Sequence, residues 1–228
     1  ALRAGGFESV AVTFLHSYAR PDHEQAVAER LWAEGFSVSA SHDILPEHRE
    51  YERASTTVLN AYVSPLMSRY LGRLGQAVEK DLGLGPMRVM QSNGGVTDAA
   101  RAGRYGVHTV LSGPAGGVVG ALKAASRAGA TGIITFDMGG TSTDVSLLPG
   151  ELSYTTQSEI EGFPLRIPVL DIHTVGAGGG SIAWVDAGGA LRVGPQSAGA
   201  DPGPACYGRG GDHFTVTDAH VVLGRLPA

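Results

Sequence analysis

One short segment combines a carboxylate, two glycines and three hydroxyl residues, which are the residue types that suit the phosphate tail of a nucleotide. The segment runs from Phe136 to Asp144 and reads FDMGGTSTD. Glycines let backbone N–H groups approach phosphate oxygens because no Cβ intervenes, and hydroxyl groups add donors. The Asp137 carboxylate would repel a bare phosphate, so it makes sense beside a cation, most simply hydrated Mg²⁺. The segment therefore favours phosphate binding, and the alternative is a plain hairpin turn with a capping Asp.

Each polar or glycine position of this segment has an expected role. Asp137 is the candidate catalytic residue and the candidate metal ligand, holding Mg²⁺ through water or acting as a base.

A second glycine-rich loop, VGAGGGS at 175–181, could also cradle an anion, or it could be a turn kept small so that two sheets pass closely. The sequence leaves those two interpretations open. The candidate nucleotide-binding residues are Gly139, Gly140, Thr141, Ser142, Thr143, Asp144, Gly178 and Gly179.

Other polar motifs favour structural roles. The stretch Asn93–Asp98 is similar in composition to the phosphate loop and could line the cleft, but Asn-Gly-Gly is first of all a turn sequence. The Pro- and Gly-rich stretch Asp201–Arg209 is too rigid and too polar for a flexible linker. It could form part of a surface that binds a substrate or a subunit. Cys206 has no His or Asp at an informative spacing, which favours a small buried residue over a nucleophile. Glu52 and Arg53 are expected to form an ion pair on a helix surface, and the alternative is that Arg53 reaches the cleft.

The first half of the chain has the pattern of an α/β lobe. We expect strands at 9–15, 36–40 and 87–91, with mostly parallel pairing. A helix that starts at Pro21 and stops at Gly35 should bury Val27, Leu31 and Trp32. Helical spacing continues from 49 to 82, and Pro65 should divide that stretch into two helices because proline lacks an N–H.

The second half has a different pattern, in which strands are joined by tight turns. A Gly-rich turn at 112–117 leads into a helix over 117–127 with small side chains. Beyond it we expect an antiparallel meander of strands at 133–137, 144–148 and 152–156. The expected domain boundary lies near residue 128, which gives two parts, 1–128 and 129–228.

Composition excludes several classes of function. The chain has 228 residues and a net charge of −5, so it has no basic surface that would indicate nucleic-acid binding. The single cysteine excludes an intrachain disulfide, and no apolar run approaches the ~20 residues that span a bilayer. No signal-peptide pattern is visible, so a cytoplasmic protein without nucleic-acid or membrane partners is expected. The 34 glycines are about twice the usual ~7% and indicate backbone brought close to a ligand.

Long motifs carry a resemblance to known proteins over essentially the whole chain. One segment resembles the interlobe helix, second phosphate loop and following strand of actin, the heat-shock chaperone ATPases and the sugar kinases: VLSGPAGGVVGALKAASRAGATGIITFDMGGTSTDVSLL. Further motifs resemble one branch of that superfamily, the hydantoinase A / 5-oxoprolinase family: AVTFLHSYARPDHE, EYERASTTVLNAYVSP, QSNGGV, LSGPAGG, HTVGAGGGSIAWVD, SAGADPGPACYGRGG and TVTDAHVVLGRL.

The resemblance implies an α/β fold of the actin-like (RNase H-like) ATPase type, comprising the end of the first lobe and the start of the second. It implies ATP and Mg²⁺ as cofactors, a cyclic amide such as 5-oxoproline or N-methylhydantoin as substrate, and a hydantoinase B-type subunit or domain as partner. Relatives use the same ATPase in carboxylating ketones. The family's first phosphate loop and its adenosine-binding loop are missing here, so we expect this chain to be an inactive piece of a larger enzyme.

Two other functions would also use parts of this sequence. In an NAD-dependent dehydrogenase, Gly113 and Gly116 would open the phosphate-binding helix, and Asp137, 24 residues after Gly113, would bind ribose. A Rossmann unit needs a helix after that acid, whereas GGTSTDVSLL turns directly into a strand. A nucleotide-driven conformational switch without small-molecule chemistry would use the same kind of phosphate loop, so the sequence leaves this function as an alternative.

Overall fold

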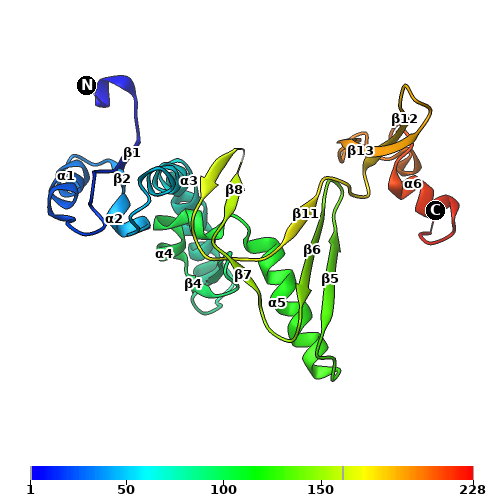
Figure 1. Ribbon diagram of the computed structural model, residues 1–228, viewed down its shortest axis with the longest axis horizontal. Helices are drawn as coiled ribbons and strands as arrows, with labels where there is room; N and C mark the ends of the chain where they lie inside the picture. Colours follow the sequence, from blue (N-terminus) through cyan, green and yellow to red (C-terminus); the bar gives the residue numbers. More distant parts are fainter. Residues whose placement is uncertain (1, 161, 228) are drawn as a thin grey trace. The chain divides into compact units, whose positions relative to one another are not determined.

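The computed structural model describes residues 2–160 and 162–227 (Figure 1). Contacts between Cα atoms divide the chain into two compact units. Unit 1 comprises Ala1–Val119 and Ser153–Leu170, and unit 2 comprises Gly120–Leu152 and Asp171–Ala228. The division falls inside the helix α5 (Ser112–Arg127). These units are a different partition from the two lobes, 1–128 and 129–228, which remain a prediction.

Unit 1 begins with a strand–helix–strand crossover, as predicted. Strands β1 (Ser9–Val12) and β2 (Ser37–Ala40) pair in parallel, and α1 (Asp22–Ala33) connects them. The predicted buried face of α1 was wrong, because Glu24 and Ala28 are buried while Val27 and Trp32 are exposed. Helix α1 faces inward at Glu24 because that carboxylate accepts hydrogen bonds from the segments that follow both strands.

The long helix α3 (Glu50–Gln76) is continuous through Pro65, so the predicted division into two helices was wrong. Proline cannot donate the N–H that would normally reach the carbonyl of Ala61. The Ser9 hydroxyl donates to that carbonyl oxygen at 2.7 Å. A side chain from β1 therefore satisfies the backbone group that Pro65 leaves without a helical partner.

The rest of unit 1 surrounds α3. Strands β3 (Arg88–Met90) and β4 (Val96–Asp98) form an antiparallel hairpin, so the expected parallel pairing of the third strand was wrong. The Asn93 side chain accepts from the N–H of Gly95, and Asp98 caps the next helix, so Asn93–Asp98 is a turn. A small core cluster packs beneath α3, and it consists of Ile44, Val107, Leu165, Ile167 and Val169. The remaining elements are η1 (Arg3–Gly5), α2 (Ser41–Ile44), η2 (Ala77–Asp81), α4 (Ala99–Arg104), η3 (Gly106–Thr109), β7 (Tyr154–Thr155), β8 (Ser158–Ile160), β9 (Phe163–Leu165) and β10 (Val169–Leu170).

Unit 2 contains a three-stranded antiparallel sheet in the order β11-β6-β5. Its strands are β5 (Ile133–Met138), β6 (Thr143–Leu148) and β11 (His173–Val175), and Figure 1 shows them running side by side. The predicted hairpin of the first two strands is confirmed. The third strand of the predicted meander was wrong, because β7 pairs with β10 in unit 1 and β11 takes its place beside β6.

The C-terminal part of unit 2 is a hairpin with a short helix. It consists of β12 (Ser181–Val185), β13 (Leu191–Ser197), η4 (Ala205–Tyr207) and α6 (Val216–Val222). Helix α5 begins at Ser112, five residues before the predicted start, so the Gly-rich stretch forms its first turns and not a separate loop.

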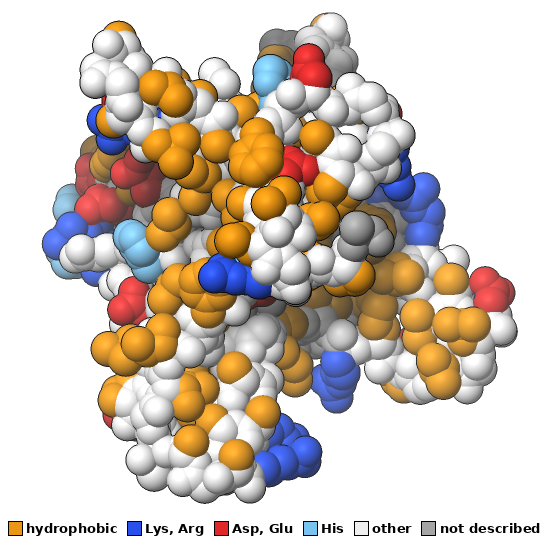
Figure 2. All heavy atoms as spheres, turned by 90° about the vertical axis from the view of Figure 1, so that its right-hand side faces the viewer, with side chains coloured by type: hydrophobic (Ala, Val, Ile, Leu, Met, Phe, Trp, Pro, Cys, Tyr) orange, Lys and Arg blue, Asp and Glu red, His pale blue; other side chains and the backbone are white. Residues whose placement is uncertain are grey.

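One face of the three-stranded sheet is apolar and open. Ile134, Phe136 and Leu147 are exposed there, while Ser146 and Leu148 on the opposite face are buried. Figure 2 shows hydrophobic side chains spread over much of the visible surface. Exposed apolar side chains in such numbers are typical of surfaces that other elements or chains cover.

Candidate functional site

Two carboxylates face one another at the end of the β5–β6 hairpin. Asp137 on β5 is the direct cross-strand partner of Asp144 on β6, and Asp144 is in turn the partner of Thr174 on β11. Directly opposed residues of an antiparallel pair project from the same face, and like charges placed there repel. Asp137 is exposed, and half-buried Asp144 accepts a hydrogen bond of 2.6 Å from the Thr174 hydroxyl. The pair therefore has the charge and position to hold a cation.

The turn between these strands presents backbone donors. The N–H of Gly139 donates to the Ser142 carbonyl at 2.9 Å and closes the turn. Within residues 2–160 and 162–227, no acceptor takes the N–H groups of Gly140, Thr141 and Ser142. Open space lies where a Cβ of Gly140 would stand, since no heavy atom comes within 4 Å of that point. Three consecutive unpaired N–H groups, with open space at Gly140, fit a phosphate group. The backbone nitrogen of Thr141 lies against Gly178, since a Cβ added to Gly178 would come within 2.7 Å of it.

Thr143 differs from its neighbours in the predicted site. Its side chain is buried, and its hydroxyl donates to the carbonyl of Ala177 at 2.6 Å. In this conformation the hydroxyl joins the turn to the second glycine-rich loop, and it is not available to a phosphate. Thr141 is exposed and Ser142 is half-buried beside the unpaired N–H groups.

The second glycine-rich loop packs directly on the first. The N–H groups of Gly179 and Gly180 donate to the carbonyls of Gly139 and Gly140 at 2.8 and 2.7 Å, and the N–H of Gly178 donates to the Ser181 hydroxyl. A Cβ added to Gly178 would lie 2.7 Å from the Gly139 carbonyl oxygen. Of the two interpretations left open by the sequence, this geometry favours close packing, because both N–H groups expected to cradle an anion are committed inside the protein.

Helix α6 holds the second glycine-rich loop in place, a contact that the sequence did not predict. The carbonyl of Gly179 accepts from both the N–H and the hydroxyl of Thr217, each at 2.8 Å. Thr215 and Asp218 form a capping box that fixes the start of α6. The spacing of Thr215 and Asp218 in the sequence was the available signal for this cap. The candidate phosphate loop therefore rests on a second loop that is itself tied to a capped helix.

Asp218 is held strongly in its ionised form. Burial tends to raise its pKa, but hydrogen bonds from Thr215 and Cys206 outweigh burial and lower the pKa to about 2. The Asp218 interaction raises the pKa of the Cys206 thiol. A raised pKa leaves little reactive thiolate at neutral pH. Cys206 is nevertheless exposed, so the expectation of a buried residue was wrong.

Comparison with known proteins places the chain in a family. Residues 53–228 match the family model described as hydantoinase/oxoprolinase, and residues 1–35 match its N-terminal region model. The chain belongs to the hydantoinase/oxoprolinase family. It is 42% identical to the caprolactamase subunit alpha of Pseudomonas jessenii, covering 96% of this chain and 32% of that protein. It is 43% identical to 5-oxoprolinase of Saccharomyces cerevisiae, covering 99% of this chain and 17% of that protein.

Two solved structures share the fold of this hydantoinase/oxoprolinase chain. The ATP-dependent caprolactamase from P. jessenii matches with a TM-score of 0.81 and 41% identity, over 100% of this chain and 33% of that one. Nucleotide-free acetone carboxylase matches with a TM-score of 0.78 and 32% identity, over 99% of this chain and 32% of that one. The predicted α/β ATPase-type fold is confirmed. The chain spans a third or less of the length of these relatives.

Arg53 lies in the interior of the protein and not on the helix surface where it was predicted. Its side chain is fully buried, and it donates to the Ser41 hydroxyl and to the carbonyls of Glu47 and Phe14. The predicted surface pair with Glu52 was wrong, because Glu52 binds Arg49 instead. Ser41 also donates to the buried carboxylate of Glu24, so one hydroxyl joins two buried charges. This network fixes the segments that follow β1 and β2.

The described residues contain neither a cluster of metal ligands nor a helix that could cross a membrane. No group of three or more His, Cys, Asp or Glu side chains suited to a metal ion occurs in residues 2–160 and 162–227. The two opposed carboxylates still fit Mg²⁺, which usually keeps several waters and takes only one or two protein carboxylates. Over the same residues, every helix is too short or too polar to traverse a bilayer.

Proposed function

We propose that this chain is the ATP-binding and ATP-hydrolysing portion of an ATP-dependent cyclic-amide hydrolase of the 5-oxoprolinase or N-methylhydantoinase type. One observation carries the proposal: the opposed carboxylates Asp137 and Asp144 flank a turn with three unpaired N–H groups. The names of the relatives support the substrate class, since 5-oxoprolinase and caprolactamase both act on lactams.

Each residue of the turn has a role in the proposed site. The N–H groups of Gly140, Thr141 and Ser142 donate to phosphate oxygens, and the free hydroxyls of Thr141 and Ser142 add donors. Asp137 holds Mg²⁺ through water or accepts a proton as a base, and Asp144 is oriented by Thr174. Gly139, Thr143, Gly178 and Gly179 contribute by holding the turn in shape.

The need for ATP follows from the chemistry of lactams. A resonance-stabilised amide is a poor electrophile, and water attacks it slowly. ATP supplies a γ-phosphoryl group whose transfer to the amide oxygen makes a good leaving group and leaves the carbon open to water. The contribution of the protein is to position the reactants and to neutralise charge.

The match to acetone carboxylase supports a second candidate function, the ATPase part of a ketone carboxylase. A nucleotide-driven switch without small-molecule chemistry is a third, because a phosphate loop alone does not specify what the hydrolysis drives. The relative named as a subunit alpha supports a multi-subunit enzyme, and we propose a hydantoinase B-type subunit or domain as the partner in the cytoplasm.

The test is ADP release by the full-length protein together with its partner. We expect ADP release to rise when 5-oxoproline, N-methylhydantoin or caprolactam is added. A rise with acetone and bicarbonate, and none with any lactam, would identify the carboxylase. Release that is indifferent to every added substrate would identify the switch.

A further inference from the structure

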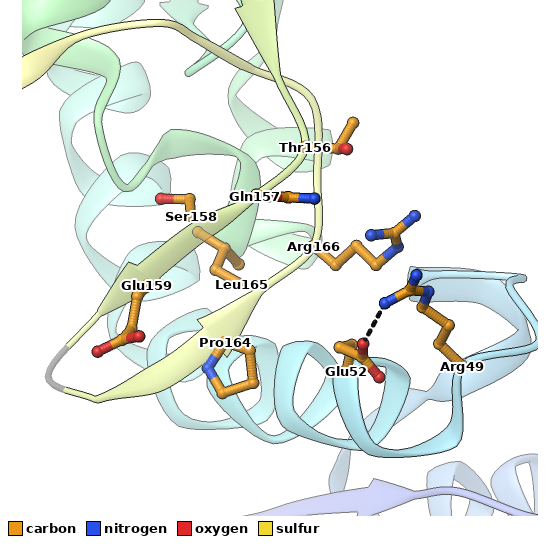
Figure 3. Close-up of a pocket in the computed structure, with 9 residues that line it drawn as sticks. All are labelled: Arg49, Glu52, Thr156, Gln157, Ser158, Glu159, Pro164, Leu165 and Arg166. Atoms are coloured by element: carbon orange, nitrogen blue, oxygen red, sulfur yellow. Dashed lines mark hydrogen bonds and ion pairs between the residues drawn. The ribbon is translucent and has the colours of Figure 1, made fainter.

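Unit 1 contains a polar pocket that the proposed nucleotide site does not use. It has a volume of about 340 Å³, within the usual range for small-molecule sites. Its walls include Arg49 and Glu52 at the start of α3, Gln157 and Ser158 near β8, and Leu165 and Arg166 from β9 onward. Figure 3 shows both guanidinium groups extending toward the same side of the pocket.

Each arginine is oriented by one glutamate and keeps other N–H groups free. Arg49 Nη1 donates to Glu52 Oε1 at 2.8 Å, and Arg166 Nε donates to Glu47 Oε2. Within the described residues, no acceptor takes Nη2 of Arg49 or either terminal nitrogen of Arg166. The arginine side chains are 49% and 22% exposed, so they can reach a ligand without unfolding. The Arg49 hydrogen bond also lowers the pKa of Glu52, which keeps that carboxylate ionised and the pair intact.

Further donors surround the two arginines. The Thr156 and Ser158 hydroxyls and the Gln157 amide line the pocket, and none of them makes a side-chain hydrogen bond within residues 2–160 and 162–227. Pro164 and Leu165 supply an apolar wall. The pocket therefore combines many donors with a small apolar surface and a further carboxylate, Glu159.

The pocket has a rigid base. Buried Arg53 donates to the carbonyl of Glu47 at 2.6 Å, which fixes the segment that presents Glu47 to Arg166. The N–H of Arg166 donates to the buried Thr56 hydroxyl at 3.0 Å, which ties Arg166 to α3. Arg166 therefore starts from a restrained position, which lowers the entropy lost when a ligand binds.

We propose that this pocket is a binding site for the carboxylate of a small organic acid with a compact apolar body. Planar guanidinium groups match the two oxygens of a carboxylate, and the uncommitted amide and hydroxyl groups complete its hydrogen bonds. The apolar body of the acid packs on Pro164 and Leu165. Three glutamates, Glu47, Glu52 and Glu159, outnumber the two arginines, so the pocket suits a monoanion better than a phosphate dianion. Figure 3 shows the Glu159 side chain on the side of the pocket away from both guanidinium groups, where it leaves their free N–H groups open to a carboxylate. The site is independent of the proposed nucleotide function.

Calorimetric titration of the intact protein tests the proposal with a matched pair of probes. Cyclopentanecarboxylate has the required charge and apolar ring, and cyclopentanecarboxamide has the same shape without the charge. We expect the carboxylate to bind at least about tenfold more tightly than the carboxamide and than inorganic phosphate, the equivalent of one charge-assisted hydrogen bond.

Variants locate the binding. Arg49→Gln and Arg166→Gln should each weaken carboxylate binding at least about tenfold. Arg69→Gln is the matched control, because Arg69 forms a similar exposed pair with Glu8 at 3.2 Å outside this pocket. Circular dichroism confirms that each variant is folded. Equal binding of carboxamide and carboxylate, tighter binding of phosphate, no binding of the carboxylate, or unchanged binding in both pocket variants would each overturn the proposal.

Discussion

At the scale of single residues, Asp137 and Asp144 carry the proposed chemistry. Their opposition across β5 and β6 is unfavourable for the isolated hairpin, because two carboxylates on one face repel. Such a pair makes sense where a cation is bound. The sequence predicted both residues, because a carboxylate at each end of a Gly-Gly-Thr turn is visible in the chain. It could not predict that Thr174 orients one of them, since no strand was predicted at 173–175 and the strand expected beside β6 was the one at 152–156.

Asp137→Asn tests this pair directly. In the full-length protein we expect ATP turnover to fall roughly a hundredfold or more, the range for loss of one acid–base or charge-stabilising group. Because the substitution also removes a repulsion, thermal stability without Mg²⁺ should stay the same or rise. The exposed Glu151→Gln in the same unit is the control. Near-normal turnover at saturating Mg²⁺ would contradict the role of Asp137.

Gly140→Val tests the turn. The backbone of Gly140 is not left-handed and no atom lies within 4 Å of its added Cβ, so the valine should cost little stability. The side chain would instead fill the space beside the unpaired N–H groups, and nucleotide binding by the full-length protein should weaken at least about tenfold. Gly132→Val is the control, because its Cβ would also meet open space just before β5. Unchanged nucleotide affinity in calorimetry would mean that the turn is merely a hairpin.

Asp218 makes stability depend on pH. Its pKa of about 2 in the folded protein is lower than the ordinary 3.8, so its stabilising effect is complete above about pH 4. That effect is lost as the pH falls from about 4 toward 2. Asp218→Asn should lower stability at neutral pH by about 1 kcal/mol through loss of the carboxylate half of the capping box, and should flatten the acid limb of the unfolding curve. An acid limb as steep as in the unaltered protein would rule this account out.

At the scale of elements, local patterns predicted most helices and strands but not every partner. The strand–helix–strand start and the β5–β6 hairpin follow from short-range signals such as Gly35 and Gly139-Gly140. The continuity of α3 could not be predicted, because it depends on Ser9, which lies 52 residues from Ala61. The pairing of β7 with β10 also joins segments that are not adjacent in the sequence, so no local pattern predicts it. Buried Arg53 was missed for the same reason.

The Ser9–Ala61 hydrogen bond can be measured by a double-mutant cycle. Ser9→Ala leaves the Ala61 carbonyl without its partner and should cost about 1–3 kcal/mol in the free energy of unfolding. In a Pro65→Ala background the restored N–H can reach that carbonyl, so the cost of Ser9→Ala should fall. Ser37→Ala is the control, because Ser37 is the register partner of Ser9 on β2. An equal cost in both backgrounds would show that Ser9 does not compensate for Pro65.

At the scale of the whole molecule, the fold is shared with two ATP-dependent enzymes that are about three times as long as this chain. Long motifs predicted the family and the fold, because each glycine- and hydroxyl-rich loop is one continuous stretch of the sequence. An actin-like site grips phosphates between loops from two lobes, and the sequence contains the motif of only one of them. We therefore propose that this chain supplies one side of the nucleotide site. We also propose that other parts of the enzyme supply the opposing loop and the adenosine pocket.

The most direct test is calorimetric titration of MgATP into the full-length protein and, in parallel, into residues 1–228. Affinity depends on convergent polar groups that enclose a ligand, so one side of a site should lose most of it. We expect the full-length protein to bind MgATP and residues 1–228 to bind it very weakly. Binding of similar strength by residues 1–228 would show that a complete site lies within them, and no binding by the full-length protein would contradict the nucleotide site itself.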